Sequence, residues 1–222
     1  MKKIIITLIL ITQFSFAQTS KNVGDFSKVT VFDKISVKLI PSNENKIELK
    51  GKYENEAELV NNNGELKIRL PLGKFLDGDD LVATVYFKNI DAVEANEGSY
   101  LSCESEIKSI AFDIIAKEGA IIKINVNAEK VILKASQGAE ITLSGKAQNL
   151  DIVTNTGAKV KAGTCRTEQT TVSVNAGGFA DVYATNLVDA KTRAGGTITI
   201  YGNPKQVNEK KVLGGKILII KK

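Results

Sequence analysis

The sequence predicts an all-β fold: a single-stranded right-handed parallel β-helix (β-solenoid) with about 19–20 residues per coil. The first observation is a series of glycines spaced 18 to 21 residues apart, a period typical of stacked repeats. The second is that a very small residue (alanine, serine or glycine) follows each of these glycines. The series comprises Gly98, Gly119, Gly138, Gly157, Gly177, Gly195 and Gly214.

The third observation is a pair of alternating apolar runs around each marker glycine. Mostly aliphatic residues stand three and five positions after it, for example Ile122 and Ile124, with polar residues between them. A similar run stands seven, five and three positions before it, for example Phe112, Ile114 and Ala116. This alternation is typical of half-buried strands. Each repeat therefore holds two short strands joined by two tight corners, and it buries its apolar side only by stacking on its neighbours.

The marker glycines have a physical role in this fold. A sharp corner needs a residue that tolerates a positive φ, which glycine adopts without a Cβ penalty. The small residue after it keeps the corner thin enough for the next coil, about 4.8 Å away. An antiparallel sandwich or barrel also repeats its strands every 8 to 12 residues or so. A meandering sheet has no reason to show columns that agree over a full two-strand period, so the solenoid is favoured.

Residues 1–17 have the features of a signal peptide. Lys2 and Lys3 precede an apolar run from Ile4 to Ile11, and Ser15-Phe16-Ala17 provides a cleavage site. The run is shorter than the roughly 20 apolar residues of a membrane-spanning helix. We therefore expect an exported mature chain that does not span a membrane after cleavage. Because no cysteine follows the leader, we do not expect acylation there.

Residues 18–90 are expected to form β-rich opening coils and a cap. Alternating runs indicate four strands, at residues 29–39, 46–50, 65–70 and 81–87. Asn61-Asn62-Asn63-Gly64 favours a tight reversal, and the stretch 72–80 is expected to be a flexible loop. Open solenoid ends expose unpaired backbone, so this section is expected to cover one end of the stack.

Residues 91–222 are expected to form the regular β-helix coils. After Gly195 the pattern weakens, because Glu209, Lys210 and Lys211 fall where core residues should stand. We expect a looser last turn over residues 201–211. A final strand over residues 214–220 is then followed by charged edge protection from Lys221 and Lys222.

Composition excludes several classes of function. The net charge of +5 falls to about +3 once the leader lysines are removed, and no basic run with interleaved aromatics indicates nucleic-acid binding. The chain has no histidine, which removes Ser-His-Asp and Cys-His nucleophile systems and histidine-rich zinc sites. Cys103 and Cys165 lie three coils apart, about 14 Å, so we expect no disulfide. Cys103 is expected to be a small core residue and Cys165 a corner residue.

Three parts of the sequence together resemble the head GIN domain family of auto-transporter adhesins. They are Val31-Phe32-Asp33-Lys34-Ile35-Ser36-Val37, the strand Gly64-Glu65-Leu66-Lys67-Ile68, and the repeated Gly-Ala-x-Val/Ile unit. The resemblance covers about Phe26 to Ile220. It implies an exported bacterial envelope β-helix with an adhesion role and no recognised catalytic set. The chain departs from the family's name in having no obvious translocator or sorting domain.

Three surface features are candidates for chemistry. Asp113, Asp151 and Asp189 share one outward column, but Ile132 and Thr171 interrupt it, so Asp113 and Asp151 stand about 10 Å apart. That spacing is too wide for a retaining glycosidase and marginal for an inverting one, so this column is interpreted as solvated acids rather than a hydrolase or calcium site. Asp77-Gly78-Asp79-Asp80 lacks the later glutamate of an EF-hand loop and is interpreted as an acidic turn. Tyr100 beside Ile121 is a candidate exposed apolar contact.

The sequence therefore predicts a non-catalytic exported envelope protein, an adhesion or surface-binding β-helix. No catalytic, cofactor-binding or metal-binding residue is assigned, and no cofactor is expected. The expected partners are a cell-surface protein, a glycan or a second copy of the chain, with no nucleic acid. The expected location is the periplasm or outer surface of a Gram-negative bacterium. The alternatives are a carbohydrate-active enzyme on the same fold, or a purely structural spacer.

Overall fold

The computed structural model describes residues 19–221, so the expected signal peptide at residues 1–17 lies outside the described part of the chain. The described chain is almost entirely β. Its elements in chain order are β1 Thr19–Asn22, β2 Lys28–Val31, β3 Ser36–Pro41, β4 Lys46–Gly51, β5 Glu58–Asn62, β6 Glu65–Arg69, the short 3-10 helix η1 Gly78–Asp80, β7 Leu81–Phe87, β8 Ala92–Ala95, β9 Tyr100–Ala116, β10 Ile121–Ala135, β11 Glu140–Thr154, β12 Lys159–Asn175, β13 Phe179–Tyr183, β14 Leu187–Arg193, β15 Thr197–Tyr201, β16 Gln206–Val212 and β17 Lys216–Ile219.

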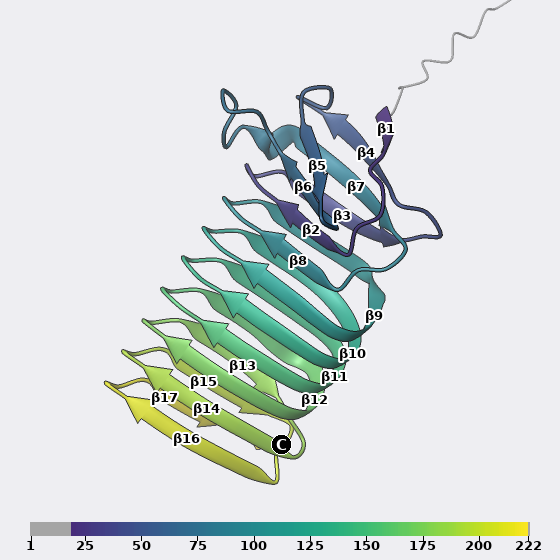
Figure 1. The fold of residues 1–222 in the computed structure, drawn as a ribbon. Helices are drawn as coiled ribbons and strands as arrows, with labels where there is room; N and C mark the ends of the chain where they lie inside the picture. Colours follow the sequence, from purple (N-terminus) through teal and green to yellow (C-terminus); the bar gives the residue numbers. More distant parts are fainter. Residues whose placement is uncertain (1–18, 222) are drawn as a thin grey trace, which may run out of the picture.

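The strands wind into a β-solenoid, as predicted (Figure 1). Parallel pairing places equivalent residues of successive turns opposite one another, so the predicted columns are confirmed by the register. The column three positions after the marker glycines is buried from end to end. It consists of Leu101, Ile122, Ile141, Val160, Ala180, Ile198 and Ile217. These aliphatic ladders form one continuous core along the stack.

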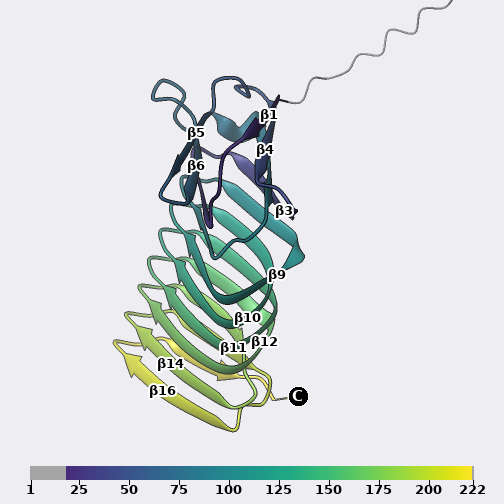
Figure 2. The same ribbon diagram turned by 45° about the vertical axis from the view of Figure 1, so that its right-hand side comes forward.

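The second corner of each turn differs from the prediction in the middle of the stack. Strands β9 to β12 run on for 15 to 17 residues and curve round that side without a tight turn (Figure 2). The ladder continues through the bend, where Val126 pairs with Gly145 and Ala128 with Ala147. Inward Ala128 and Ala147 are small enough for the strand to bend around them. The polar residues at this bend resemble a corner in the sequence, although the backbone there stays paired.

The predicted glycine corner is confirmed, with one addition. Gly119 has φ 73°, and Glu118 before it is also left-handed, with φ 55°. The Ala120 N–H donates to the Lys117 carbonyl at 3.0 Å, which closes a tight turn with two left-handed central residues. The Gly119 N–H donates to the Gln137 carbonyl of the next turn, also at 3.0 Å. The corners are thus hydrogen-bonded to one another along the stack.

The small residue after the marker glycine is buried from Ser99 to Gly178, as suits the thin corner expected from the sequence. Ala139 and Ala158 are fully buried at this position. At Gly178 a Cβ would come within 2.6 Å of the Thr154 Oγ1, and at Gly196 within 2.5 Å of a Val174 methyl. At these two corners the residue therefore packs on the last inward residue of the preceding turn, and glycine leaves the room that Thr154 and Val174 require.

The strand expected over residues 29–39 is wrong, because the first corner interrupts it. Strand β2 ends at Val31 and β3 begins at Ser36, with Asp33 and Lys34 both at φ 61° between them. Lys34 takes the place of the marker glycine, and its N–H donates to the Glu97 carbonyl of the next turn at 3.0 Å. Because no glycine marks this corner, the glycine series in the sequence does not predict it.

The opening turns are stacked out of sequence order. Strand β2 lies between β6 and β8, parallel to both, and β3 lies between β7 and β9 in the same way. The turn made by β6 and β7 is later in the chain but lies farther out in the stack (Figure 1). Antiparallel strands cover its outer edges: β5 pairs with β6, β4 pairs with β7, and β1 pairs with β4.

The last turn is more regular than expected. Strand β16 pairs with β14 from Gln206 to Val212, so the looser turn predicted over residues 201–211 is wrong for its second half. Glu209 and Lys211 occupy the positions opposite Ala190 and Thr192 and form an ion pair at 3.3 Å. At the open end these positions face solvent, which is why charged residues are tolerated there.

Candidate functional site

The predicted acid column has the register expected for it. Asp113, Ile132, Asp151, Thr171 and Asp189 are successive partners along the outer face. The Lys130 Nζ lies 3.0 Å from Asp151, and the Asn208 Nδ2 donates to Asp189 at 2.5 Å. Because two turns separate each pair of acids, their carboxylates are not arranged as the close pair of a retaining glycosidase.

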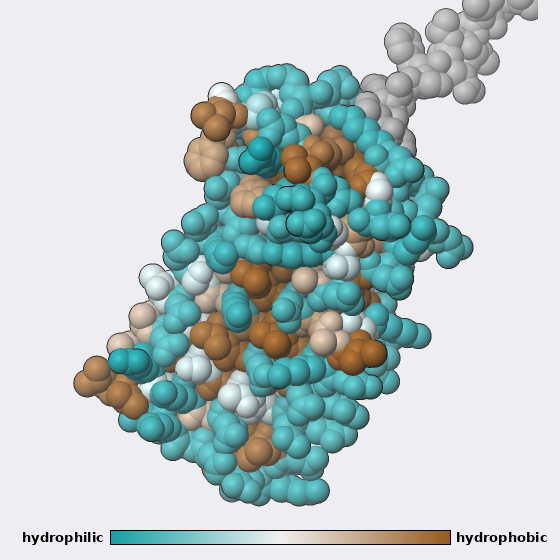
Figure 3. Space-filling model, in the orientation of Figure 1, coloured by the Kyte–Doolittle hydropathy of each residue, from teal (hydrophilic) through white to brown (hydrophobic). Residues whose placement is uncertain are grey.

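Aliphatic side chains stand among these acids on the same outer face. Ile132 lies between Asp113 and Asp151, while Ile115 and Val153 flank Lys134 in the next column. Figure 3 shows brown side chains gathered over the middle strands of this face, with teal side chains around them. We call Ile115, Ile132 and Val153 the outer-face patch. Val153 is exposed, and Ile115 and Ile132 are half-buried. A partly exposed apolar patch with charged neighbours is a feature of contact surfaces.

The expected apolar contact between Tyr100 and Ile121 lies on the other sheet face. The two residues are register partners on β9 and β10. Ile121 is 37% exposed, whereas the Tyr100 ring is half-buried beneath the Lys123 ammonium, 5.6 Å from its centroid. This pair offers less apolar surface than the sequence suggested.

The acidic turn at residues 77–80 is held by a residue that the sequence reasoning missed. Asp33 is 3% exposed, and its carboxylate accepts hydrogen bonds from the Leu70 N–H at 2.8 Å and the Leu76 N–H at 3.2 Å. Its carbonyl accepts one from the Gly78 N–H at 3.0 Å. The loop expected to be flexible is thus fastened to the first corner. The sequence signal for this corner was Asp33, because aspartate tolerates a left-handed backbone conformation.

The acids of this turn point to separate partners. Asp79 lies 3.4 Å from the Lys34 Nζ, and Asp77 accepts a hydrogen bond from the Tyr53 hydroxyl at 3.4 Å. Within residues 19–221, histidine, cysteine and acidic side chains form no group of three that could hold a metal ion. The geometry of the turn is therefore that of a structural connection.

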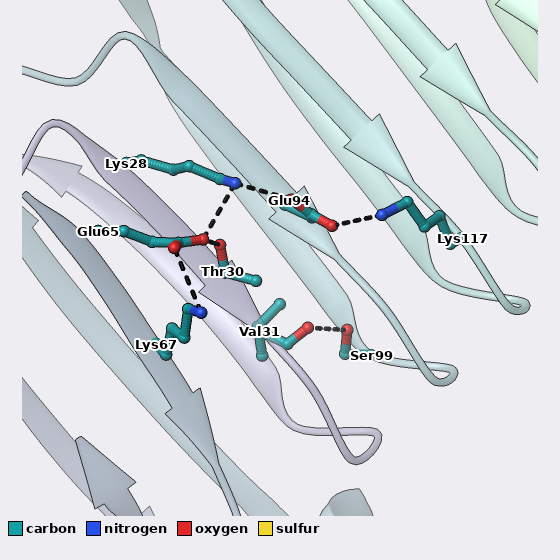
Figure 4. Close-up of polar contacts among 8 residues, drawn as sticks. All are labelled: Lys28, Thr30, Val31, Glu65, Lys67, Glu94, Ser99 and Lys117. Carbon is teal, nitrogen blue, oxygen red and sulfur yellow. Dashed lines mark hydrogen bonds and ion pairs between the residues drawn. The ribbon is translucent and has the colours of Figure 1, made fainter. Parts of the chain in front are cut away.

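A ladder of ion pairs crosses the turns that are stacked out of order (Figure 4). The Lys28 Nζ on β2 lies 3.0 Å from Glu65 on β6 and 2.8 Å from Glu94 on β8. Glu94 also meets the Lys117 Nζ at 2.8 Å, and the Thr30 hydroxyl donates to Glu65 at 2.6 Å. These contacts join β6, β2 and β8 on the surface, in the order of the stack.

The ladder alters the ionisation of its members. The hydrogen bond from Thr30 is the main reason that the pKa of Glu65 is lowered to about 2, with Lys28 and Lys67 adding to it. Burial alone would raise the pKa of Glu94, but hydrogen bonds from Lys117 and Lys28 outweigh it and lower that pKa. Both glutamates are therefore held in the charged form that the ladder needs.

Both cysteines are buried and free, as expected for the absence of a disulfide. Burial raises the pKa of Cys103 to about 11 and that of Cys165 to about 12. Cys165 lies at the bend of β12, opposite Gly145, and is fully buried, so the corner expected there is a paired strand rather than a tight turn. At neutral pH both thiols stay protonated, so neither is a reactive nucleophile.

A pocket near the C-terminal end brings together aromatic, basic and polar side chains, and the sequence analysis did not predict it. Its side chains come from β12, β13, β15 and the segments after β15 and β17: Thr164, Arg166, Tyr183, Tyr201, Asn203 and Ile220. Gly163 and Gly202 complete its lining. We call these eight residues the tyrosine pocket. The sequence offered one sign of this pocket, namely two glycines outside the marker series, each near the column that contains Tyr183 and Tyr201.

The described chain contains only the short helix η1, so it holds no helical membrane-spanning segment. The fold defines the class of the protein as a β-solenoid with a capped N-terminal end. The chain belongs to the family described as "Putative auto-transporter adhesin, head GIN domain", whose model matches residues 25–204. No curated protein matches the chain.

Solved structures share this fold. A "putative adhesin" from Bacteroides fragilis is 18% identical with a TM-score of 0.85, and the match covers 92% of this chain and 96% of that one. A "putative adhesin" from Parabacteroides distasonis is 16% identical with a TM-score of 0.73 and the same coverage. A "putative lipid binding protein" from that species is 13% identical with a TM-score of 0.69, again with the same coverage. These likenesses establish the fold.

Proposed function

We propose that the protein is an exported, non-catalytic, surface-binding protein of the adhesin type. The match to the adhesin family over residues 25–204 is the observation that supports this most strongly. The outer-face patch adds to it, because backbone pairing on both sides holds Ile115, Ile132 and Val153 in a fixed, flat array. A rigid surface of mixed apolar and charged groups can bind a partner without reorganising.

The partner is proposed to be a protein or glycan of a cell surface, or a second copy of the chain. The test is saturable binding of the fluorescently labelled mature chain to fixed bacterial and epithelial cells. We expect a Val153→Lys variant to bind more weakly, because it places a second lysine beside its register partner Lys134 and removes one of the three apolar side chains of the patch. An Ile110→Lys variant is the matched control, since Ile110 is 75% exposed and outside the patch. Labelled protein that binds no cell type would indicate a structural spacer instead.

The proposed division of the chain into segments is consistent with an exported surface-binding role. Residues 1–17 would direct export, residues 18–90 would supply the opening coils and cap, and residues 91–222 would form the regular coils. The proposed location is the periplasm or outer surface of a Gram-negative bacterium. Protease treatment of intact cells distinguishes the two, since only a surface-exposed chain is cleaved without permeabilisation.

Catalysis on carbohydrate is the alternative that this proposal opposes. We expect the wild-type chain to release no reducing ends from a polysaccharide panel. Turnover that is lost on Asp113→Ala and Asp151→Ala substitution would contradict the proposal, since those acids would then act in the reaction.

A further inference from the structure

We propose that the tyrosine pocket binds a pyranose ring of a saccharide, an inference that rests on the surface-binding function proposed above. The two tyrosines are register partners, with Tyr183 at the end of β13 and Tyr201 at the end of β15. Each follows a buried residue, Val182 or Ile200, and therefore faces outward. The fold thus sets two phenol rings side by side on adjacent turns.

Two glycines make room for these rings. A Cβ on Gly202 would come within 2.8 Å of the Tyr183 ring, and a Cβ on Gly163 within 3.1 Å of the Tyr201 ring. Each ring therefore rests directly over backbone, where any other residue would place a side chain. Neither glycine belongs to the marker series of the corners. Gly202 has φ 93° and a Cβ there would also lie 2.4 Å from the Ala184 carbonyl, so its backbone favours glycine as well, while Gly163 lies at the register shift between β11 and β12.

Polar groups surround the aromatic surface. The Arg166 guanidinium lies 5.5 Å from the centre of the Tyr183 ring, and its Nη1 donates to the Tyr183 hydroxyl at 3.5 Å. The exposed Thr164 and Asn203 add a hydroxyl and an amide, while Ile220 closes one side. Arg166 is the one charged residue among the described residues that line the pocket. The pocket therefore suits a neutral or an anionic ligand.

A saccharide matches this combination better than other ligand classes. The face of a pyranose presents C–H bonds of slight positive charge, which favour the negative face of an aromatic ring, while its hydroxyls bond to the polar groups around it. The pocket has a volume of about 550 Å³, within the range of small-molecule sites. A lipid tail would find a single aliphatic side chain, Ile220, among the residues that line it.

An extended peptide is disfavoured by the backbone. Peptides commonly bind by adding a strand to a free sheet edge. Strand β13 is paired with β12 and β15, and β15 is paired with β13 and β17, so neither tyrosine strand offers such an edge. Recognition must therefore come from the side chains.

The test is calorimetric titration of the mature chain with cellohexaose, mannohexaose and hexagalacturonic acid at up to millimolar concentration. We expect saturable binding of at least one of these probes. Tyr183→Ala and Tyr201→Ala should each weaken it at least tenfold, whereas Tyr100→Ala, on the same sheet face but distant turns, should not change it. Gly163→Ala should also weaken binding with little change in melting temperature, because it displaces only the Tyr201 ring.

Three results would overturn the inference: no binding of any probe, equal binding by the tyrosine variants, or binding of octaproline in place of the saccharides. The cell-binding assay separates this failure from failure of the proposed function. If the tyrosine variants still bind cells as the wild type does, the surface-binding role stands and the assignment of the pocket is wrong.

Discussion

At the N-terminal end of the solenoid, antiparallel strands cover the outer edges of both sheet faces. At the C-terminal end, no strand within residues 19–221 pairs with the outer edge of β16 or β17. The covered end depends on polar groups, namely the buried Asp33 carboxylate and the ladder of Lys28, Glu65 and Glu94. The uncovered end is protected by Glu209 and Lys211 at positions that would otherwise be apolar.

The comparison shows that one repeated unit is stabilised in two ways. In the regular coils, aliphatic columns and glycine corners are sufficient, because each turn has the same neighbours. In the opening coils, order in the stack differs from order in the chain, so local pattern does not specify which turn contacts which. Specific ion pairs and a buried carboxylate supply that information. We expect substitutions in the two regions to differ accordingly.

The largest expected effect is at Asp33. Asp33→Ala leaves the buried Leu70 N–H and the half-buried Leu76 N–H without acceptors, and loss of the acceptor of a buried donor costs about 1–3 kcal/mol. We therefore expect a loss of about 3 kcal/mol in the free energy of unfolding, measured by urea titration. Asp113→Ala, at an exposed aspartate of the regular coils, is the control and should cost less than about 0.5 kcal/mol. Equal effects would show that Asp33 does not organise the cap.

The next largest effect is expected at a regular corner. Ala139 is fully buried after its marker glycine, so Ala139→Leu should overfill the corner and cost about 1–3 kcal/mol. The exposed Ala111 of β9 provides the matched control, since Ala111→Leu meets solvent. An unchanged melting temperature for Ala139→Leu would contradict the packing of the corner.

A double-mutant cycle sharpens the same point. Gly178→Ala places a Cβ within 2.6 Å of the Thr154 Oγ1 and should cost about 1–2 kcal/mol. Combining it with Thr154→Ala should recover part of this loss, because the pair then resembles Ala135 and Ala158 one turn earlier. Additive losses would mean that the two positions do not contact each other.

A smaller effect, dependent on pH, is expected in the ion-pair ladder. The pKa of Glu65 is lowered to about 2, below the ordinary value near 4.3, so its charged form stabilises the fold above about pH 4. That contribution is lost as pH falls from about 4 towards 2. Thr30→Val removes the main cause, so the variant should be about 1 kcal/mol less stable at pH 7 and nearly equal to wild type near pH 2. Urea unfolding at pH 7, 4 and 2.5 measures the difference; a gap that is constant with pH would contradict it.

The smallest effect on stability is expected at the open end. Replacing Glu209 and Lys211 together by isoleucine removes the charges that protect the edge, with a change in the free energy of unfolding below about 0.5 kcal/mol. The variant should instead self-associate, as measured by sedimentation velocity, because an apolar unpaired edge templates strand pairing. A variant that sediments as the wild type does would show that another feature protects this end.

The regular coils could be predicted from the sequence because their geometry forces a signal at every turn. A left-handed corner favours glycine, and the column from Leu101 to Ile217 repeats with it. The opening corner could not, because Lys34 adopts the same backbone without being glycine and is stabilised by tertiary hydrogen bonds. The position of β2 between β6 and β8 left no pattern either, since it depends on contacts between distant segments. The tyrosine pocket was missed for the same reason: Gly163 and Tyr201 lie together only after the turns stack.

The out-of-order stacking of the opening turns is the central claim, and disulfide trapping tests it most directly. In a Cys103→Ala, Cys165→Ala background, one variant carries Lys28→Cys with Ala92→Cys and another carries Glu65→Cys with Ala92→Cys. Residues 28 and 92 are partners on adjacent strands, whereas 65 and 92 lie two turns apart, about 10 Å, beyond the roughly 7 Å limit for a disulfide. We expect the first variant to form an intramolecular disulfide under mild oxidation and the second to remain reduced. Ready oxidation of the second variant and none of the first would place β6 beside β8 and contradict the account.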